Sequence, residues 1–145
     1  MKKNLPFVHP QFPGLRREEL RKLPAAALYT LPDGYFDAVK EEYKKRRDTM
    51  YRKLTEIPGI KCTLPAGAFY FMVTLPVDDA DCLQNFLLNE FDDNGDTVLF
   101  ACGEPFYGTP GKGKNEVRLA YTICGEDIER SVDILKKGIE AYNNK

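Results

Sequence analysis

The chain has 145 residues, of which 21 are basic and 22 acidic, so its formal net charge is -1. This balance gives no electrostatic basis for binding nucleic acid or an anionic membrane surface, and we expect neither as a partner. Apolar residues make up 43% of the chain, enough for the core of one ordinary domain. No apolar run has the length of a membrane span, and Asn4 and Pro6 interrupt any leader-like stretch. We therefore expect a soluble, cytoplasmic protein.

Residues 1–32 are predicted to form a Pro-rich arm or connector. A high proline density there excludes a long helix and a central strand; the prolines are Pro6, Pro10, Pro13, Pro24 and Pro32. A single domain is then expected over residues 33–145.

The first element of that domain is a predicted helix over residues 34–57. Its apolar residues keep mostly helical spacing, and Pro58-Gly59 ends it. The basic run 44–47 is flanked by Glu41, Glu42 and Asp48, which favours a solvated helix face over a basic binding patch.

Two strands follow at residues 61–64 and 68–75, separated by a tight Pro-Ala-Gly connection. A second helix is predicted over residues 78–91, capped by Asp78 or Asp79 and stopped by Asn94-Gly95. A third strand at 97–102, a Gly/Pro loop at 104–116, a fourth strand at 116–122 and a helix at 125–142 complete the chain. The order α-β-β-α-β-β-α predicts an α+β fold: a two-layer α/β sandwich with helices packed on a small four-stranded sheet.

Catalytic and metal-binding motifs are not found in the sequence. The loop GTPGKGKNE lacks the pattern of a phosphate-binding loop, because a strand rather than a helix follows it; a flexible connection is expected instead. Ser131 lies within a predicted helix and His9 in the arm, so no nucleophilic triad is predicted. Cys62, Cys82, Cys102 and Cys124 are spaced too widely for a metal site and are expected to be small buried residues in a reducing compartment.

Arg118 stands out within the apolar strand NEVRLAYT. Val117, Leu119 and Tyr121 alternate around it, so they form one buried face and Arg118 lies on the opposite face. A guanidinium group can bind a carboxylate through two parallel hydrogen bonds, which a lysine cannot do. Alternation alone leaves open whether Arg118 faces solvent or a ligand.

Several segments, taken together, resemble the C-terminal small domain of class I/II, fold-type I aminotransferases, which depend on pyridoxal phosphate. PAGAFYF (65–71) is similar to the segment that opens the sheet of that domain, and EVRLAY with the helix after it resembles the last strand and helix. The best resemblance is to the aspartate aminotransferase type, over residues 25–142. It implies amino-group transfer of the aspartate/2-oxoglutarate type, with Arg118 binding the α-carboxylate of the substrate. It also implies that Phe106, Tyr107 and Gly103 line the substrate pocket.

The resemblance also implies what this chain lacks. The family's Schiff-base lysine and the large cofactor-binding domain have no counterpart in the sequence, so we expect no bound pyridoxal phosphate and no activity from this chain alone. An alternative role is a stand-alone module that binds carboxylates or another subunit. A surface left without its large domain would be apolar, which predicts a homodimer or other self-association.

Overall fold

The structure is a computed structural model that describes residues 32–145. The predicted Pro-rich arm lies outside the described residues except at Pro32, and the division of the chain at residue 32 stays a prediction. Along the sequence the chain divides into two units, Met1–Val39 and Lys40–Lys145. Of the first unit, only a turn and the first residues of one helix are described. The site and the core lie in the second unit, Lys40–Lys145.

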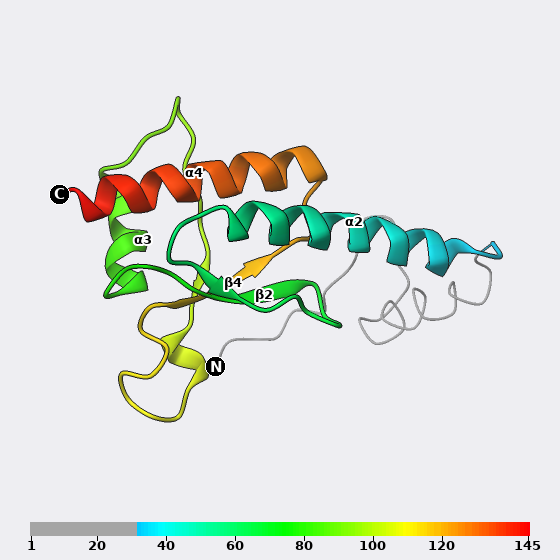
Figure 1. Cartoon of the computed structure of the whole chain (residues 1–145), viewed down its shortest axis with the longest axis horizontal. Coiled ribbons are helices and arrows are strands. Elements are labelled where there is room, and N and C mark those ends of the chain that lie inside the picture. Colours follow the sequence, from blue (N-terminus) through cyan, green and yellow to red (C-terminus); the bar gives the residue numbers. More distant parts are fainter. Residues whose placement is uncertain (1–31) are drawn as a thin grey trace, which may run out of the picture. The chain divides into compact units, whose positions relative to one another are not determined.

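The predicted order of helices and strands is confirmed, and so is the α+β class (Figure 1). One further element, a short 3-10 helix, lies within the predicted Gly/Pro loop. The elements are α2 (Tyr35–Thr55), β1 (Lys61–Cys62), β2 (Tyr70–Thr74), α3 (Ala80–Asn89), β3 (Ala101–Cys102), the 3-10 helix η2 (Glu104–Phe106), β4 (Glu116–Ala120) and α4 (Gly125–Asn143).

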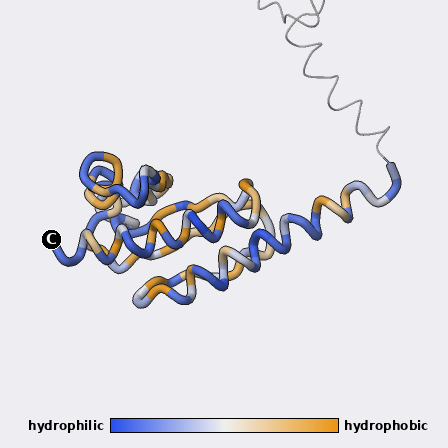
Figure 2. Tube along the Cα trace, turned by 90° about the horizontal axis from the view of Figure 1, so that it is seen from above, coloured by the Kyte–Doolittle hydropathy of each residue, from blue (hydrophilic) through white to orange (hydrophobic). Residues whose placement is uncertain are grey.

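The four strands form one antiparallel sheet in the order β1-β2-β4-β3. Along β2 and β4 every second side chain is buried, as the predicted alternation requires. These buried side chains join one core with residues from all three helices, and α2 and α4 lie side by side over them in Figure 1. Figure 2 shows hydrophilic and hydrophobic residues interspersed along the helices, as expected for helices that bury only one side. We call this the covered face of the sheet and the opposite one the open face.

The N-terminus of α3 is formed as predicted. The Asp79 carboxylate accepts hydrogen bonds from the backbone N–H of Asp81 at 2.9 Å and of Cys82 at 3.2 Å. These bonds satisfy two amides that have no partner within the helix. Residues 78–91 are thus helical only from Ala80 to Asn89.

The predicted stop signal of this helix has a different role. Asn94 and Gly95 have φ values of 59° and 86° and form the tip of a turn in which Asp93 pairs with Asp96. The helix ends earlier, at Asn89, so the predicted boundary was too late. Positive φ favours Asn and Gly at a turn as much as after a helix, which is why the pattern was ambiguous.

The third strand is much shorter than predicted, because only Ala101 and Cys102 of residues 97–102 pair with β4. The Gln84 side chain on α3 takes one backbone N–H that a longer strand would use, and the Thr97 side chain ties the segment to α3. The Thr97 hydroxyl donates to the carbonyl of Leu87 at 2.8 Å, and the N–H of Phe100 donates to Gln84 Oε1 at 3.3 Å. Leu99 is left 67% exposed.

The basic run on α2 is only in part the solvated face that the sequence predicts. Lys44 and Lys45 are exposed, but Arg46 and Arg47 are half-buried. Arg46 donates to the carbonyl of Thr122 at 2.7 Å, and Arg47 donates to that of Pro65 at 3.3 Å. Both arginines therefore link α2 to the connections at the ends of the strands.

Candidate functional site

Arg118 lies in the middle of β4, on the open face of the sheet. Its register partners are Met72 on β2 and Ala101 on β3, so strands flank it on both sides. Val117 and Leu119 point to the covered face and are buried, which confirms the predicted alternation. A side chain on a strand with paired neighbours has a fixed Cα position, so the guanidinium group starts from a rigid base.

Two aromatic rings flank the Arg118 guanidinium. Its Cζ atom lies 5.4 Å from the centre of the Tyr70 ring and 5.0 Å from the centre of the Phe106 ring. Both distances are within the range of cation–π attraction, which holds the side chain without using its N–H donors. Among residues 32–145 no carboxylate lies within 4.0 Å of the Arg118 guanidinium, and no hydrogen bond from it is found.

The other predicted site residues come from the loop between β3 and β4. The N–H of Gly103 donates to the carbonyl of Glu116 at 2.7 Å, and a Cβ on Gly103 would lie 2.7 Å from that oxygen. Gly103 therefore permits a close backbone approach and presents no side chain to a ligand. Glu116, which accepts this hydrogen bond, is the first residue of β4 and precedes Arg118 by two positions.

Tyr107 is turned toward Glu116. Its hydroxyl donates to Oε2 of Glu116, and this hydrogen bond raises the pKa of Tyr107 above its ordinary value. Glu104 is held by the same loop, because its Oε1 accepts from the N–H of Gly111 at 3.0 Å. The predicted flexible connection thus contains a 3-10 turn and several internal hydrogen bonds.

The structure brings Phe106 to Arg118, as the resemblance implies, whereas Tyr107 and Gly103 reach Arg118 only through Glu116 and the backbone. Tyr70 was not among the predicted site residues. The signal that could have found it is strand alternation, because Phe71 and Val73 are buried and Tyr70 and Met72 are therefore on the open face. Whether these residues bind substrate stays a prediction.

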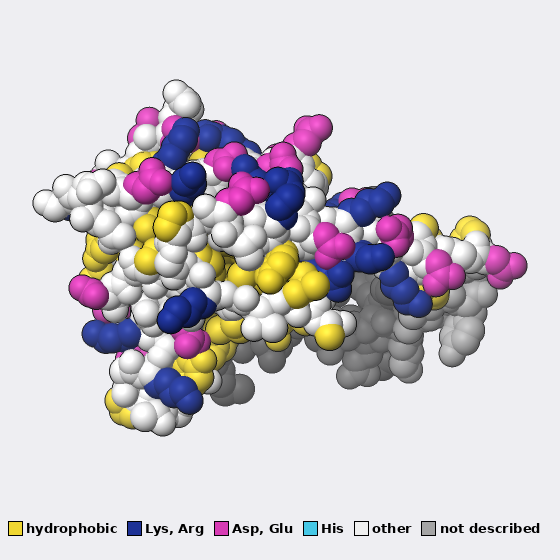
Figure 3. All heavy atoms as spheres, in the orientation of Figure 1, with side chains coloured by type: hydrophobic (Ala, Val, Ile, Leu, Met, Phe, Trp, Pro, Cys, Tyr) yellow, Lys and Arg dark blue, Asp and Glu magenta, His cyan; other side chains and the backbone are white. Residues whose placement is uncertain are grey.

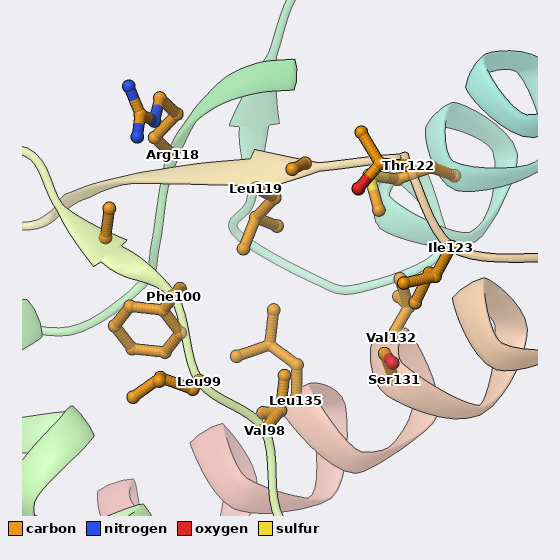
Figure 4. A pocket seen from close by; sticks show the side chains of 13 residues that line it. Val98, Leu99, Phe100, Arg118, Leu119, Thr122, Ile123, Ser131, Val132 and Leu135 are labelled. Atoms are coloured by element: carbon orange, nitrogen blue, oxygen red, sulfur yellow. The ribbon is translucent and has the colours of Figure 1, made fainter. Parts of the chain in front are cut away.

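A cavity of about 470 Å³ lies on the other side of β4. Apolar side chains from residues 98–100, β4 and α4 line it, among them Leu119, Val132 and Leu135. Figure 4 shows Arg118 projecting away from this cavity, on the opposite side of β4 from Leu119. The guanidinium group therefore points out of the apolar cavity, although Arg118 is among the residues that line it.

Pyridoxal phosphate, which the resemblance implies for a complete enzyme, does not fit the residues around this cavity. No lysine among residues 32–145 lines it, and Arg118, its one basic lining residue, points away, so nothing there would bond the aldehyde or hold the phosphate. Lys53 and Lys114 lie elsewhere, where hydrogen bonds to Asp133 and Asp79 respectively raise their pKa values. A raised pKa disfavours the neutral amine that Schiff-base formation needs.

The cysteines were predicted to be buried, and for two of them this is wrong. Cys82 and Cys124 are exposed, because both lie in the first turn or at the cap of a surface helix. Cys62 and Cys102 are half-buried, and all four are free thiols. Within residues 32–145 no three His, Cys, Asp or Glu side chains are grouped as a metal site would require. None of the helices in this part has the length and apolar character that a bilayer crossing requires.

Comparison with known proteins identifies relatives for most of the chain, although no family model matches it. The aspartate aminotransferase of Bacillus subtilis is 29% identical over 126 residues, which cover 82% of this chain and 30% of that enzyme. The aspartate aminotransferase of Sulfurisphaera tokodaii is 32% identical over 133 residues, which cover 80% of this chain and 32% of that enzyme. The chain thus spans about a third of the length of the curated relatives it matches.

Solved structures agree with this result. The α-aminoadipate aminotransferase LysN of Thermus thermophilus, crystallised with N-(5'-phosphopyridoxyl)-L-leucine, matches with a TM-score of 0.70. The match covers 88% of this chain and 32% of that one, at 24% identity, and shows that the fold is shared. By sequence and by fold, the chain is therefore related to the fold-type I, pyridoxal-phosphate-dependent aminotransferases of the aspartate aminotransferase type, and it corresponds to the small-domain part of such an enzyme.

Proposed function

We propose that this chain supplies the carboxylate-binding arginine of an amino-group transfer reaction between amino acids and keto acids. The observation that carries this proposal is the state of Arg118: a guanidinium on a strand of the sheet, flanked by Tyr70 and Phe106, with no acidic partner among residues 32–145. A permanent positive charge with free donors is a receptor for a carboxylate. The relationship to aminotransferases makes an amino-acid or keto-acid carboxylate the best-supported ligand.

The geometry suits a task of positioning. A guanidinium group can grip both oxygens of a carboxylate at once, which fixes the orientation of the substrate as well as its place. The two aromatic rings restrict the arginine side chain, so less rotamer freedom is lost when the ligand binds. Phe106 also gives the site an apolar wall, which the carbon skeleton of the substrate can contact.

The chemistry of amino transfer in the homologous enzymes depends on pyridoxal phosphate, and we propose that this chain alone does not turn over. The test is to mix the purified chain with pyridoxal phosphate, aspartate and 2-oxoglutarate, to record the absorbance spectrum, and to assay oxaloacetate. We expect the spectrum of the free cofactor and no oxaloacetate. Stoichiometric cofactor fixed by borohydride on one lysine, with turnover, would contradict this part of the proposal.

The role of Arg118 is tested by binding. With 2-oxoglutarate as the probe, NMR titration of the chain should show saturable shifts around β4 that Arg118→Gln abolishes. Arg118→Lys should weaken the binding, because a lysine keeps the charge but loses the two-pronged geometry. Arg52→Gln is the matched control, since Arg52 is an exposed helix arginine that pairs with Glu129 at 2.7 Å. Equal binding by the wild type and Arg118→Gln would refute the proposal.

A second function, pairing with another copy of the chain, is favoured by the apolar surface around the site. Tyr70, Met72 and Phe106 are between 36% and 53% exposed on or beside the open face. Figure 3 shows charged side chains along the helices and hydrophobic ones gathered below them, over the strands. Contiguous exposed apolar surface is typical of interaction sites. Light scattering across a concentration series should show association that Met72→Asp weakens, and a clean monomer at high concentration would exclude it.

A further inference from the structure

Glu116 is the acidic residue that could most easily block Arg118. It lies two residues earlier on β4, so its side chain leaves the strand on the same open face. Side chains two residues apart on a strand start about 7 Å from each other, a gap that a glutamate and an arginine together can span. An ion pair between them would occupy the donors that a substrate carboxylate needs.

Glu116 does not make that ion pair, because the Tyr107 hydroxyl holds its carboxylate. Oε2 of Glu116 accepts the hydrogen bond from the phenol, and no Glu116–arginine contact within 4.0 Å is found among residues 32–145. The raised pKa of Tyr107 means that the phenol keeps its proton and stays a donor over the whole neutral range.

The loop fixes the Tyr107 ring in this place. A Cβ on Gly113 would lie 2.3 Å from Cε2 of the ring, so the backbone at this glycine packs directly on it. Lys112 Nζ lies 4.9 Å from the ring centre on the same loop. The Tyr107 N–H donates to the carbonyl of Glu104 at 3.0 Å. Two contacts to the ring and one to the backbone of Tyr107 thus direct its hydroxyl one way.

We propose that Tyr107 is a positioning residue that holds the Glu116 carboxylate away from Arg118 and so keeps the guanidinium open for the substrate carboxylate. This inference rests on the proposed function, because it explains how the site of Arg118 stays available. Tyr107 acts through Glu116 and need not touch the substrate. Removal of its hydroxyl alone should convert Glu116 into an internal competitor for Arg118.

Tyr107→Phe tests this, because it deletes the donor and keeps the ring that packs on Gly113. Affinity for 2-oxoglutarate should fall about two- to fivefold, the strength of an exposed ion pair that the ligand must break. The double variant Tyr107→Phe/Glu116→Gln should regain wild-type affinity, since the competitor then carries no charge. Tyr51→Phe, which removes a phenol stacked on Phe71 of the covered face, should bind as the wild type does.

A second measurement follows the ion pair itself. The Arg118 Nε–Hε resonance, assigned by its loss in Arg118→Lys, should shift in Tyr107→Phe and return in the double variant. An unchanged resonance in Tyr107→Phe, or a shift that persists in the double variant, overturns the inference whatever the affinities are. A wild-type chain without Arg118-dependent binding refutes the proposed function instead, and the resonance still decides the role of Tyr107.

Discussion

The two faces of the sheet are built from alternate residues of the same strands but are held by different forces. On the covered face Phe71, Val73, Val117 and Leu119 are almost completely buried against the helices. On the open face, one residue along in each strand, Tyr70, Met72 and Arg118 remain exposed. The buried side chains of the covered face stabilise the fold. The open face carries the Arg118 charge, which forms no ion pair within residues 32–145.

This contrast shows why one strand can serve both purposes. A side-chain period of two separates the faces completely, so the requirements of packing on one face place no restriction on the chemistry of the other. The buried residues make β4 rigid, and that rigidity is passed to Arg118 through the backbone. Four predictions test the contrast, in order of decreasing expected effect.

The largest difference in stability is expected between substitutions of two adjacent β2 residues, Phe71 and Met72. Phe71→Ala removes a side chain that is 1% exposed and should cost about 3–5 kcal/mol of unfolding free energy. Met72→Ala removes one that is 38% exposed and should change stability by no more than about 0.5 kcal/mol. Urea denaturation of both variants gives the comparison. Similar losses in the two variants would show that the open face is also packed.

The next largest effect is expected where the backbone of Gly103 packs closely against Glu116. Gly103→Ala places a Cβ 2.7 Å from the carbonyl oxygen and 2.8 Å from the Cβ of Glu116, and should cost about 1–3 kcal/mol. Gly108→Ala in the same loop is the control, because a Cβ there meets nothing within 4 Å. Thermal unfolding measures both. If Gly103→Ala is as stable as the control, the pairing of Gly103 with Glu116 is dispensable.

A smaller effect is expected at the cap of α3. Asp79→Ala removes the acceptor for two helix amides and should cost about 0.5–2 kcal/mol, whereas Asp78→Ala, at the exposed residue before the cap, should be nearly neutral. Hydrogen bonding from the N–H of Cys82 lowers the pKa of Asp79. The stabilisation is therefore present above the ordinary aspartate pKa and is lost as the pH falls through the lowered one. Stability measured from pH 2 to pH 6 should rise less steeply in Asp79→Ala.

The last prediction concerns reactivity and involves no loss of stability. Cys102 points to the covered face, where burial and then a hydrogen bond to Asp81 raise its pKa to about 12. The exposed thiols of Cys82 and Cys124 should therefore be alkylated by iodoacetamide well before Cys102 at pH 8. Mass spectrometry of peptides after a short exposure measures the order. Early labelling of Cys102 would indicate that the covered face opens readily at β3.

The parts of the fold that the sequence predicts are those set by local periodicity. The alternation around Arg118 and the position of the last helix depend only on residues close in sequence, and both are confirmed. The length of β3 was missed because the N–H of Phe100 bonds to the Gln84 side chain, which has no local pattern. The end of α3 was missed because Asn94-Gly95 is typical of a turn as well as of a helix end. The same holds for the surroundings of Arg118. Its place on the face opposite Val117 and Leu119 was predicted, whereas the approach of the Tyr70 ring and the Tyr107–Glu116 bond depend on the tertiary fold.

The central position of the β2–β4 pair has a consequence for the order of folding. Tyr70 pairs with Ala120 and Thr74 with Glu116, and the whole of α3 and the Gly/Pro loop lie between these partners in sequence. Closing so long a stretch of chain costs entropy before any contact repays it, and such pairings form slowly. Helices α2, α3 and α4 depend on local contacts and should appear first. The setting of Arg118 among Tyr70, Phe106 and β4 then assembles only in the last, rate-limiting closure.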